Sequence, residues 1–282
     1  MAHASTQANP QEIFIQQGQK FLRWSDVQEI WAYRELIYFL CLRDIKVKYK
    51  QAALGIVWVI AQPLFWMLSY TVLFGKIAKM DSQGIPYAAF SLAALVPWMF
   101  FTGACTRGSL SLVGSGTLFS KVYFPRLIIP LSSVLSALFD YCVSVICLIF
   151  VLAFYGHMPQ WWWLPGLAMS TLWVFVFAVG LSCWLGALNL KYRDVNHLLP
   201  FIMQAWMIIT PVVYPLSVIS EKYRWVLKLN PMVAIIESYR AFLFGGTVEA
   251  STVIWAIAIT LLVFLTGIVY FKSTERTFAD IV

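Results

Sequence analysis

Four cations lie within eight residues in the segment RDIKVKYK, which begins at Arg43. Lysine and arginine side chains bind phosphate oxygens, so this spacing could serve to recognise a phosphorylated ligand. In a helix, Arg43, Lys46 and Lys50 share one face, and Asp44 and Lys48 form an acid-first i,i+4 pair. Topology signalling and attraction to anionic lipid, worth about 1 kcal/mol per cation, would also explain the lysines. They would not explain the retained acid, because acids contribute little to topology.

Two further charged clusters and one isolated acid stand out. SKVYFPRLIIP begins at Ser120, and LKYRDV begins at Leu190 and retains Asp194. Asp140 lies alone inside a long apolar stretch, where a carboxylate is costly and is expected to face the bundle interior. It could be a proton site, or a structural acid bonded to a neighbouring hydroxyl or cation, and we favour the structural role.

Enzymatic and metal-binding motifs are not apparent. The chain has no GxxxxGK[ST] sequence, no GxSxG sequence and no close pair of loop carboxylates. The five cysteines form no CxxC pair, and the three histidines are scattered, so we expect no metal site. The protein is therefore not expected to be an enzyme, and any ATP that drives it must bind, with Mg²⁺, to another polypeptide.

Composition places the chain in a membrane. It is 61% hydrophobic and 17% aromatic with a mean hydropathy of +0.76, whereas soluble domains are roughly 45–50% apolar. The net charge of +7 is explained by cations in cytoplasmic loops, so no nucleic-acid partner is expected. We divide the chain into a polar extension (1–27), an interfacial helix with its basic cluster (28–50) and a transmembrane domain (51–282). The extension does not resemble a signal peptide.

Six spans are expected, with both termini in the cytoplasm. In that orientation fourteen of the twenty cations lie on the cytoplasmic side. The second span is expected to be kinked or broken near Pro97. The spans are predicted at Leu54–Phe74, Tyr87–Leu112, Leu127–Tyr155, Trp163–Leu190, Leu198–Ile219 and Thr252–Phe271.

Two segments outside the spans have amphipathic patterns. Residues 214–246 form two short pieces that flank Asn230 and Pro231, each too short to cross, which indicates re-entrant helices at an outer gate or a loop lying on the bilayer. Before the first span, apolar residues recur at helical spacing and predict an interfacial helix on the inner leaflet. This stripe consists of Ile30, Tyr33, Ile37, Leu40 and Cys41.

The segment LRDIKVKYKQAALGIVWVIAQPL resembles the start of the permease subunits of type-2 export ABC transporters, within the branch that exports O-antigen and related polysaccharides. KVYFPRLIIP, KYRDV with its later TPVVYP, and LNPM with ESYR resemble motifs that follow in the same order. The residues that match are Arg43, Asp44, Lys46, Lys48, Tyr49, Lys50, Leu54, Gly55, Trp58, Pro63, Lys121, Tyr123, Phe124, Pro125, Arg126, Pro130, Tyr192, Arg193, Asp194, Pro200, Phe201, Trp206, Pro211, Tyr214, Pro215, Asn230, Pro231, Glu237 and Arg240.

The resemblance implies an all-α membrane fold of six transmembrane helices, an amino-terminal interfacial helix and short re-entrant helices between spans five and six. It implies a homodimer in the bacterial inner membrane that binds two copies of a separate ATPase and moves a lipid-linked polysaccharide. The implied ATPase-coupling residues are Lys121, Val122, Tyr123, Phe124, Pro125, Arg126 and Glu35. The implied entrance residues are Arg43, Asp44, Lys46, Lys48, Tyr49 and Lys50, with Tyr192, Arg193 and Asp194 in a second cytoplasmic loop. The implied outer-gate residues are Pro211, Pro215, Asn230, Pro231, Glu237 and Arg240.

Aromatic side chains could line the path of a polysaccharide, because sugar rings stack on flat apolar faces. The candidates are Trp58, Phe65, Trp66, Tyr70, Trp98, Phe100, Phe101, Trp206 and Tyr214. For any single one of these residues, an ordinary packing or interface-belt role is the favoured explanation. Three alternatives remain open: a secondary flippase in which Asp140 carries a proton, an exporter of another lipid or polymer such as capsule or teichoic acid, and an integral-membrane transferase.

Overall fold

The computed structural model describes residues 24–50, 55–115, 124–157 and 160–275, and every regular element within these ranges is helical. The ten α-helices within the described ranges are α1 (Trp24–Ala32), α2 (Arg34–Lys50), α3 (Val57–Tyr70), α4 (Tyr87–Ser111), α6 (Ile128–Phe154), α7 (Trp163–Lys191), α8 (Val195–Ile209), α9 (Glu221–Lys228), α10 (Pro231–Phe244) and α11 (Ala250–Thr274). Shorter helical segments are η1 (Thr71–Ile77), η2 (Val113–Ser115) and η3 (Leu216–Val218). The predicted all-α class is confirmed.

Five of these helical stretches are long and apolar enough to cross a bilayer: α3 continued by η1, and then α4, α6, α7 and α11. Their ends agree with the first, second, third, fourth and sixth predicted spans to within three residues. Such runs are predictable because about 20 consecutive apolar residues are needed to span the hydrocarbon core. The chain is therefore a multi-pass membrane protein.

Two details of the span prediction differ from the observed helices. The second span was predicted to be kinked or broken near Pro97, and helix α4 continues through Pro97 from Tyr87 to Ser111, so it is not broken there. The predicted fifth span corresponds to α8, whose 15 residues measure about 22 Å, less than the roughly 30 Å of a hydrocarbon core. Helix α8 stops because the backbone of Thr210 is extended, with ψ of 136°, directly before Pro211.

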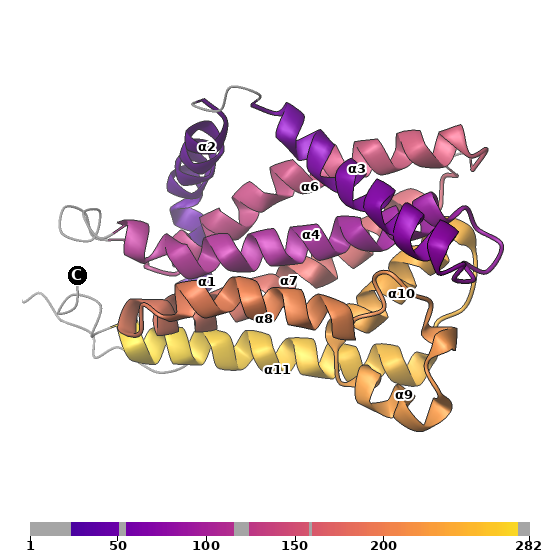
Figure 1. Ribbon diagram of the computed structural model, residues 1–282. Coiled ribbons are helices and arrows are strands. Elements are labelled where there is room, and N and C mark those ends of the chain that lie inside the picture. The colour runs from indigo at the N-terminus through magenta and orange to yellow at the C-terminus, as the bar shows by residue number, and fades with distance from the viewer. Residues whose placement is uncertain (1–23, 51–54, 116–123, 158–159, 276–282) are drawn as a thin grey trace, which may run out of the picture.

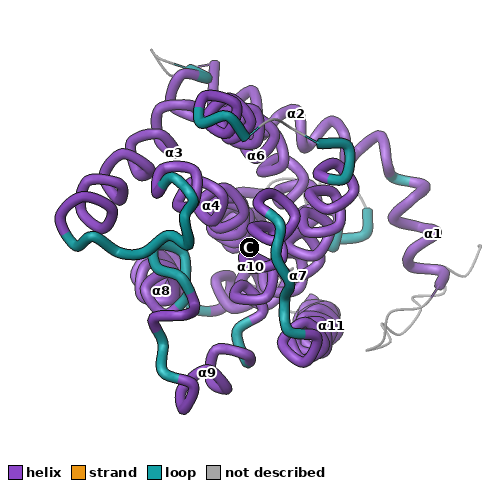
Figure 2. The backbone as a smooth tube through the Cα atoms, turned by 90° about the vertical axis from the view of Figure 1, so that its right-hand side faces the viewer, coloured by secondary structure: helices purple, strands orange, loops and turns teal. Residues whose placement is uncertain are grey.

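Helix α4 is the centre of the bundle. Buried residues make up 83% of its apolar window, against 17% of the window in α3 and η1. Seen along the helices, α4 and α10 lie in the middle, with α3, α6, α8 and α11 around them (Figure 2). Most of the apolar surface of α3 and α8 is therefore exposed, including Trp58, Phe65 and Phe201.

Helices α7 and α11 approach closely through two glycines. A Cβ atom placed on Gly267 would collide with the carbonyl oxygen of Gly180, and one placed on Gly180 would meet the backbone of Phe264. Small residues allow membrane helices to pack backbone against backbone in this way. The contact fixes α11 beside α7.

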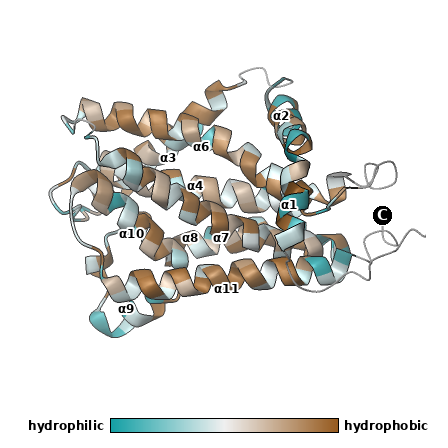
Figure 3. Ribbon diagram, turned by 180° about the vertical axis from the view of Figure 1, so that it is seen from behind, coloured by the Kyte–Doolittle hydropathy of each residue, from teal (hydrophilic) through white to brown (hydrophobic). Residues whose placement is uncertain are grey.

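The amino-terminal helices lie at one end of the bundle, where α2 runs crosswise to α4, α8 and α11 (Figure 1). They are among the more hydrophilic elements, whereas α4, α6 and α11 are mostly hydrophobic (Figure 3). A turn at Tyr33 separates α1 from α2. The apolar stripe that includes Ile37 and Leu40 packs against the protein core rather than facing outward. The exposed aromatics of this region are Trp24, Trp31, Tyr38 and Phe39.

Candidate functional site

A cavity of about 770 Å³ lies between α3, α4, α6 and α8 and reaches the end of α2. Its walls are mostly apolar or aromatic, with uncharged polar side chains between them, and its three charged side chains are Lys48, Arg107 and Asp140. The uncharged polar groups are Gln62, Thr102, Thr106, Ser144 and Gln204. A cavity of this kind, with hydrogen-bonding groups set among aromatic faces, suits a ligand that carries hydroxyls on ring systems.

The structure separates the aromatic candidates into two groups. Five of them, Trp58, Trp66, Tyr70, Trp98 and Phe100, line the cavity. Phe101 instead stacks on Phe177 at 5.1 Å in the core and meets Trp206 edge-on. Phe65 is exposed outside the cavity, and the Tyr214 hydroxyl donates to the Ile208 carbonyl at 3.0 Å.

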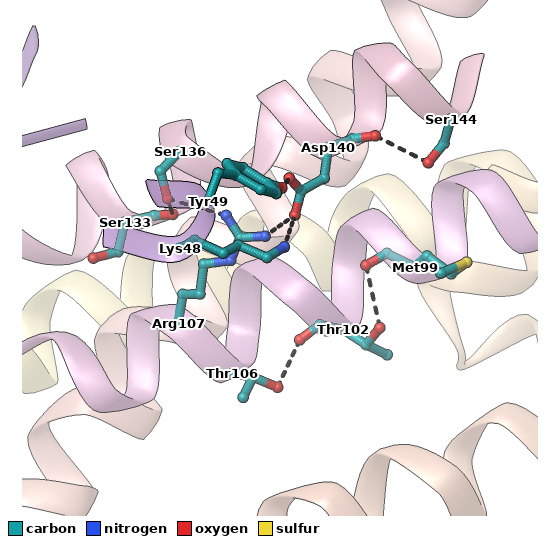
Figure 4. A network of polar contacts seen from close by, with 10 residues as sticks. All are labelled: Lys48, Tyr49, Met99, Thr102, Thr106, Arg107, Ser133, Ser136, Asp140 and Ser144. Carbon is teal, nitrogen blue, oxygen red and sulfur yellow. Dashed lines mark hydrogen bonds and ion pairs between the residues drawn. The ribbon is translucent and has the colours of Figure 1, made fainter. Parts of the chain in front are cut away.

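A polar network occupies one end of the cavity, where α2, α4 and α6 meet (Figure 4). The Lys48 Nζ lies 2.5 Å from Oδ2 of Asp140, and Arg107 Nη2 donates to the same oxygen. The Tyr49 hydroxyl donates to Oδ1 of Asp140. Burial, together with this hydrogen bond, raises the pKa of Tyr49 above its ordinary value. Asp140 thus has two neighbouring cations and one hydroxyl as partners.

Arg107 was not among the predicted site residues. The signal that could have identified it was a lone arginine near the end of an apolar helix, since charges within spans usually mark a functional site or find an internal partner. Arg107 Nη1 also donates to Ser136 Oγ at 3.2 Å. Its side chain is 25% exposed and that of Asp140 is 21% exposed, so both remain accessible from the cavity.

The predicted pair between Asp44 and Lys48 does not form. Asp44 pairs with Arg43 at 2.9 Å and accepts a 3.4 Å hydrogen bond from Ser133, whereas Lys48 turns toward Asp140. The tertiary partner Asp140 is a stronger attraction for Lys48 than an exposed i,i+4 pair, which contributes only about 0.3–0.5 kcal/mol. The two remaining cations of the cluster, Lys46 and Lys50, are exposed on α2.

The predicted coupling loop is described only in part. Lys121, Val122 and Tyr123 lie outside the described residues. Phe124 is buried, Pro125 follows it, and Arg126 donates to the main-chain carbonyl of Glu275. Arg126 Nε also lies 3.9 Å from the Glu275 carboxylate. The loop is thereby attached to the end of α11.

The other predicted cytoplasmic residues lie near this end of the bundle. Glu35 is exposed on α2. Tyr192, Arg193 and Asp194 form an exposed turn between α7 and α8. A further ion pair joins Lys272 of α11 to Asp26 of α1. The first amino-terminal helix and the last helix are therefore connected directly.

At the opposite end, Arg240 holds the non-helical segment that follows α8. Its guanidinium donates to the carbonyls of Pro211 at 2.9 Å and Val212 at 2.8 Å, pairs with Glu237 at 3.2 Å and lies 3.6 Å above the Phe90 ring. Asn230 caps α10 at Met232 and donates to Thr210 at 2.9 Å. The predicted gate residues Pro211, Asn230, Pro231, Glu237 and Arg240 thus come together, with Pro215 shortly beyond.

Within the described part of the chain, no three His, Cys, Asp or Glu residues gather in a way that could hold a metal ion. The side chains that line the cavity can bind a ligand through charge, hydrogen bonds and aromatic contact.

The chain is similar in sequence to known transport proteins. The chain is similar to the O-antigen export system permease protein RfbA of Myxococcus xanthus, with 29% identity over 259 residues that cover 90% of this chain and 98% of the relative. It is similar to the Klebsiella pneumoniae protein of the same name, with 27% identity over 249 residues that cover 88% and 95%. It is similar to the polysialic acid transport protein KpsM of Escherichia coli, with 22% identity over 243 residues that cover 84% and 92%. The family model of the ABC-2 type transporter matches residues 35–244, and the chain belongs to this family.

Proposed function

We propose that this chain is the membrane subunit of an ATP-driven exporter that moves a lipid-linked polysaccharide, of the O-antigen type, from the cytoplasm across the bacterial inner membrane. The observation that carries the proposal is the cavity, which combines five of the predicted aromatic side chains with a cationic end. Aromatic faces stack on sugar rings without trapping them by charge. Cations at one end attract the anionic head group of a lipid carrier. The names of the similar permeases support this substrate class.

The proposed assembly contains two copies of this chain and two copies of a separate ATPase that binds ATP and Mg²⁺. The exposed apolar surfaces of α3 and α8 favour burial against lipid or a second copy. We place both termini in the cytoplasm. In this arrangement α8 and the segment that follows it together form a sixth transmembrane crossing. Helix α2 then lies along the inner leaflet, because it runs crosswise to the spans.

In this orientation the loop that contains Phe124 and Arg126 faces the ATPase and couples ATP hydrolysis to movement of the spans. The second loop, Tyr192 to Asp194, lies on the same side. Helices α9 and α10 form re-entrant elements of an outer gate, held by Arg240 and Asn230. The cations of α2 lie at the cytoplasmic entrance beside the inner leaflet.

The test is purification from native membranes followed by reconstitution. We expect a nucleotide-binding subunit to co-purify, and we expect lipid-linked polymer to cross the vesicle membrane only when ATP is hydrolysed. Arg126→Glu should reduce the yield of the complex while leaving membrane insertion intact. Transport without any ATPase partner would overturn the proposal. If Asp140→Asn alone abolished such ATPase-independent transport, a proton-coupled flippase would be the better account.

A further inference from the structure

Three donors from two different helices converge on one carboxylate at the end of the cavity. Lys48 and Tyr49 come from the last turn of α2, Arg107 comes from α4, and their common acceptor is Asp140 of α6 (Figure 4). Two cations share Oδ2 while the hydroxyl takes Oδ1. A guanidinium, an ammonium and a hydroxyl around one pair of oxygens are also the donors that bind a phosphate group.

Charge at this position is not balanced. The cavity contains two cations and one anion, so its charged end has a net charge of +1 when Asp140 is ionised. A diphosphate carries more negative charge than a carboxylate and offers more acceptor oxygens, so it can engage both cations more fully. The site is also accessible, because the Lys48 side chain is 46% exposed and the other two charged groups remain partly open.

Stability alone is a weak reason for this arrangement. Exposed ion pairs contribute only about 0–1 kcal/mol, and pairs that are removed from water gain little net free energy because desolvation offsets the attraction. Charged side chains within membrane spans more often belong to a functional site. The carboxylate therefore has a second possible use, as an internal anion that keeps the donors in place while no ligand is present.

We propose that Lys48, Tyr49 and Arg107 form a binding site for the diphosphate group of a lipid carrier, and that Asp140 occupies this site until the carrier arrives. The inference rests on the proposed function for the identity of the carrier. Exchange of one anion for the other transfers Lys48 and Tyr49 from α6 to the ligand. Arrival of the carrier thereby loosens the end of α2 from α6 at the entrance to the aromatic cavity.

The test is equilibrium binding of radiolabelled polyprenyl diphosphate to the full-length protein in phosphatidylcholine nanodiscs, without ATPase or polymer. We expect Asp140→Asn to lower the Kd about tenfold, because it removes the competing anion but preserves the side-chain shape. We expect Arg107→Gln to raise the Kd at least tenfold, and Arg107→Lys to recover part of the loss. Arg34→Gln, which removes an exposed cation of the same helix α2, should leave the Kd unchanged.

Competition experiments identify the source of the anion. Unlabelled polyprenyl diphosphate should displace the label, and polyprenol should not. If inorganic pyrophosphate competes equally well, the site takes free phosphate groups and its assignment to a lipid carrier is wrong. If folded Asp140→Asn protein binds no more tightly than the wild type, the role of Asp140 as a resident anion is wrong.

Failure of the proposed binding site can be distinguished from failure of the proposed function. A protein that binds the diphosphate but exports no polymer would keep the site and lose the function. If Asp140→Asn does not fold, Lys48→Gln decides instead: weaker binding than in Arg34→Gln supports the site, and equal binding overturns it.

Discussion

Arg107 and Arg240 are associated with opposite ends of α4 but are used in different ways. Arg107 lies near the end of α4, and Arg240 packs over Phe90 near its beginning, about 25 Å away along the helix. Arg107 is partly exposed to the cavity and binds a side-chain carboxylate. Arg240 has 7% of its side chain exposed and binds main-chain carbonyls as well as Glu237.

The difference lies in what can replace each partner. A carboxylate on a neighbouring helix can be exchanged for another anion, because its side chain can rotate away. The carbonyls of Pro211 and Val212 belong to a backbone segment without helical hydrogen bonds. If Arg240 moved away, these carbonyls would have no donor, because the membrane interior supplies no water to replace it. Arg107 is therefore suited to ligand exchange, whereas Arg240 is suited to fixing the fold.

The largest expected effect on the fold comes from Arg240→Ala. The substitution leaves two carbonyls and Glu237 without their cation, so we expect a loss of about 3–5 kcal/mol of stability, or roughly 10 °C in Tm. Thermal unfolding of the purified protein in detergent measures this loss. The control is Glu221→Gln, which removes the exposed ion pair with Arg224 and should lower stability by about 0.5 kcal/mol or less. Equal losses in both variants would contradict the structural role of Arg240.

Arg107→Gln should affect transport more than stability. Loss of one charge-assisted contact to the substrate corresponds to about 1.4 kcal/mol or more, so ATP-dependent export should fall at least tenfold. The Tm should fall by much less than in Arg240→Ala. Export rates and Tm values measured on the same preparations test this division. If Arg107→Gln lowered the Tm as much as Arg240→Ala did, while the export rate per folded protein stayed normal, Arg107 would be a structural residue and the proposed difference between the two arginines would be wrong.

Tyr87→Phe tests the fixed end with a smaller change. The Tyr87 hydroxyl donates to the carbonyl of Val213, next to the two carbonyls held by Arg240. Removing it should cost about 1 kcal/mol, since one buried acceptor loses its donor. Denaturation of the variant measures the cost. If both side chains hold the same segment, the stability lost in the double variant Tyr87→Phe and Arg240→Ala should differ from the sum of the two single losses. Strictly additive losses would show that the two side chains act independently.

Arg126 contacts both a main-chain carbonyl and a side-chain carboxylate of Glu275. Glu275→Gln should show which of the two contacts contributes more to stability. The substitution keeps the main-chain carbonyl bond to Arg126 and removes the carboxylate, so we expect a change of only a few tenths of a kcal/mol. Burial raises the pKa of the Glu275 carboxyl, although Arg126 opposes the shift. A carboxyl group whose pKa is higher in the folded than in the unfolded protein binds its proton more tightly when folded. It therefore stabilises the folded protein fully at pH values below the unfolded pKa of about 4.3, and this stabilisation is lost as the pH rises through the folded pKa.

The wild-type protein should therefore lose a little stability as pH rises above about 4, and the Glu275→Gln variant should not. Thermal unfolding at a series of pH values checks the slope. A steeper dependence in the variant than in the wild type would rule out Glu275 as its source.

Much of the fold could be predicted because apolar length is a property of the sequence. Helices α4, α6, α7 and α11 follow from apolar runs of sufficient length. The early end of α8 was missed, although Pro211 restricts the backbone of Thr210 before it. What no local pattern indicates is the tertiary support of this segment, which Arg240 and Asn230 supply from α10 and its cap.

The site was predictable only as a set of residue types. Phe100 and Phe101 are adjacent and chemically identical, but one lines the cavity and the other packs on Phe177, because neighbouring positions of a helix point about 100° apart. The pairing of Lys48 with Asp140 joins residues 92 positions apart, and no local pattern indicates such a partner. Tertiary packing decides both.

The most direct test of the transport pathway is photo-crosslinking of polymer during export. Gln62 lines the cavity, and Leu68, six residues further along α3, is exposed outside it. A photoreactive amino acid at each position, in the complex with its ATPase, samples the two sides of one helix. The account predicts ATP-dependent polysaccharide adducts at position 62 and none at position 68. Adducts at position 68 with none at position 62 would contradict it.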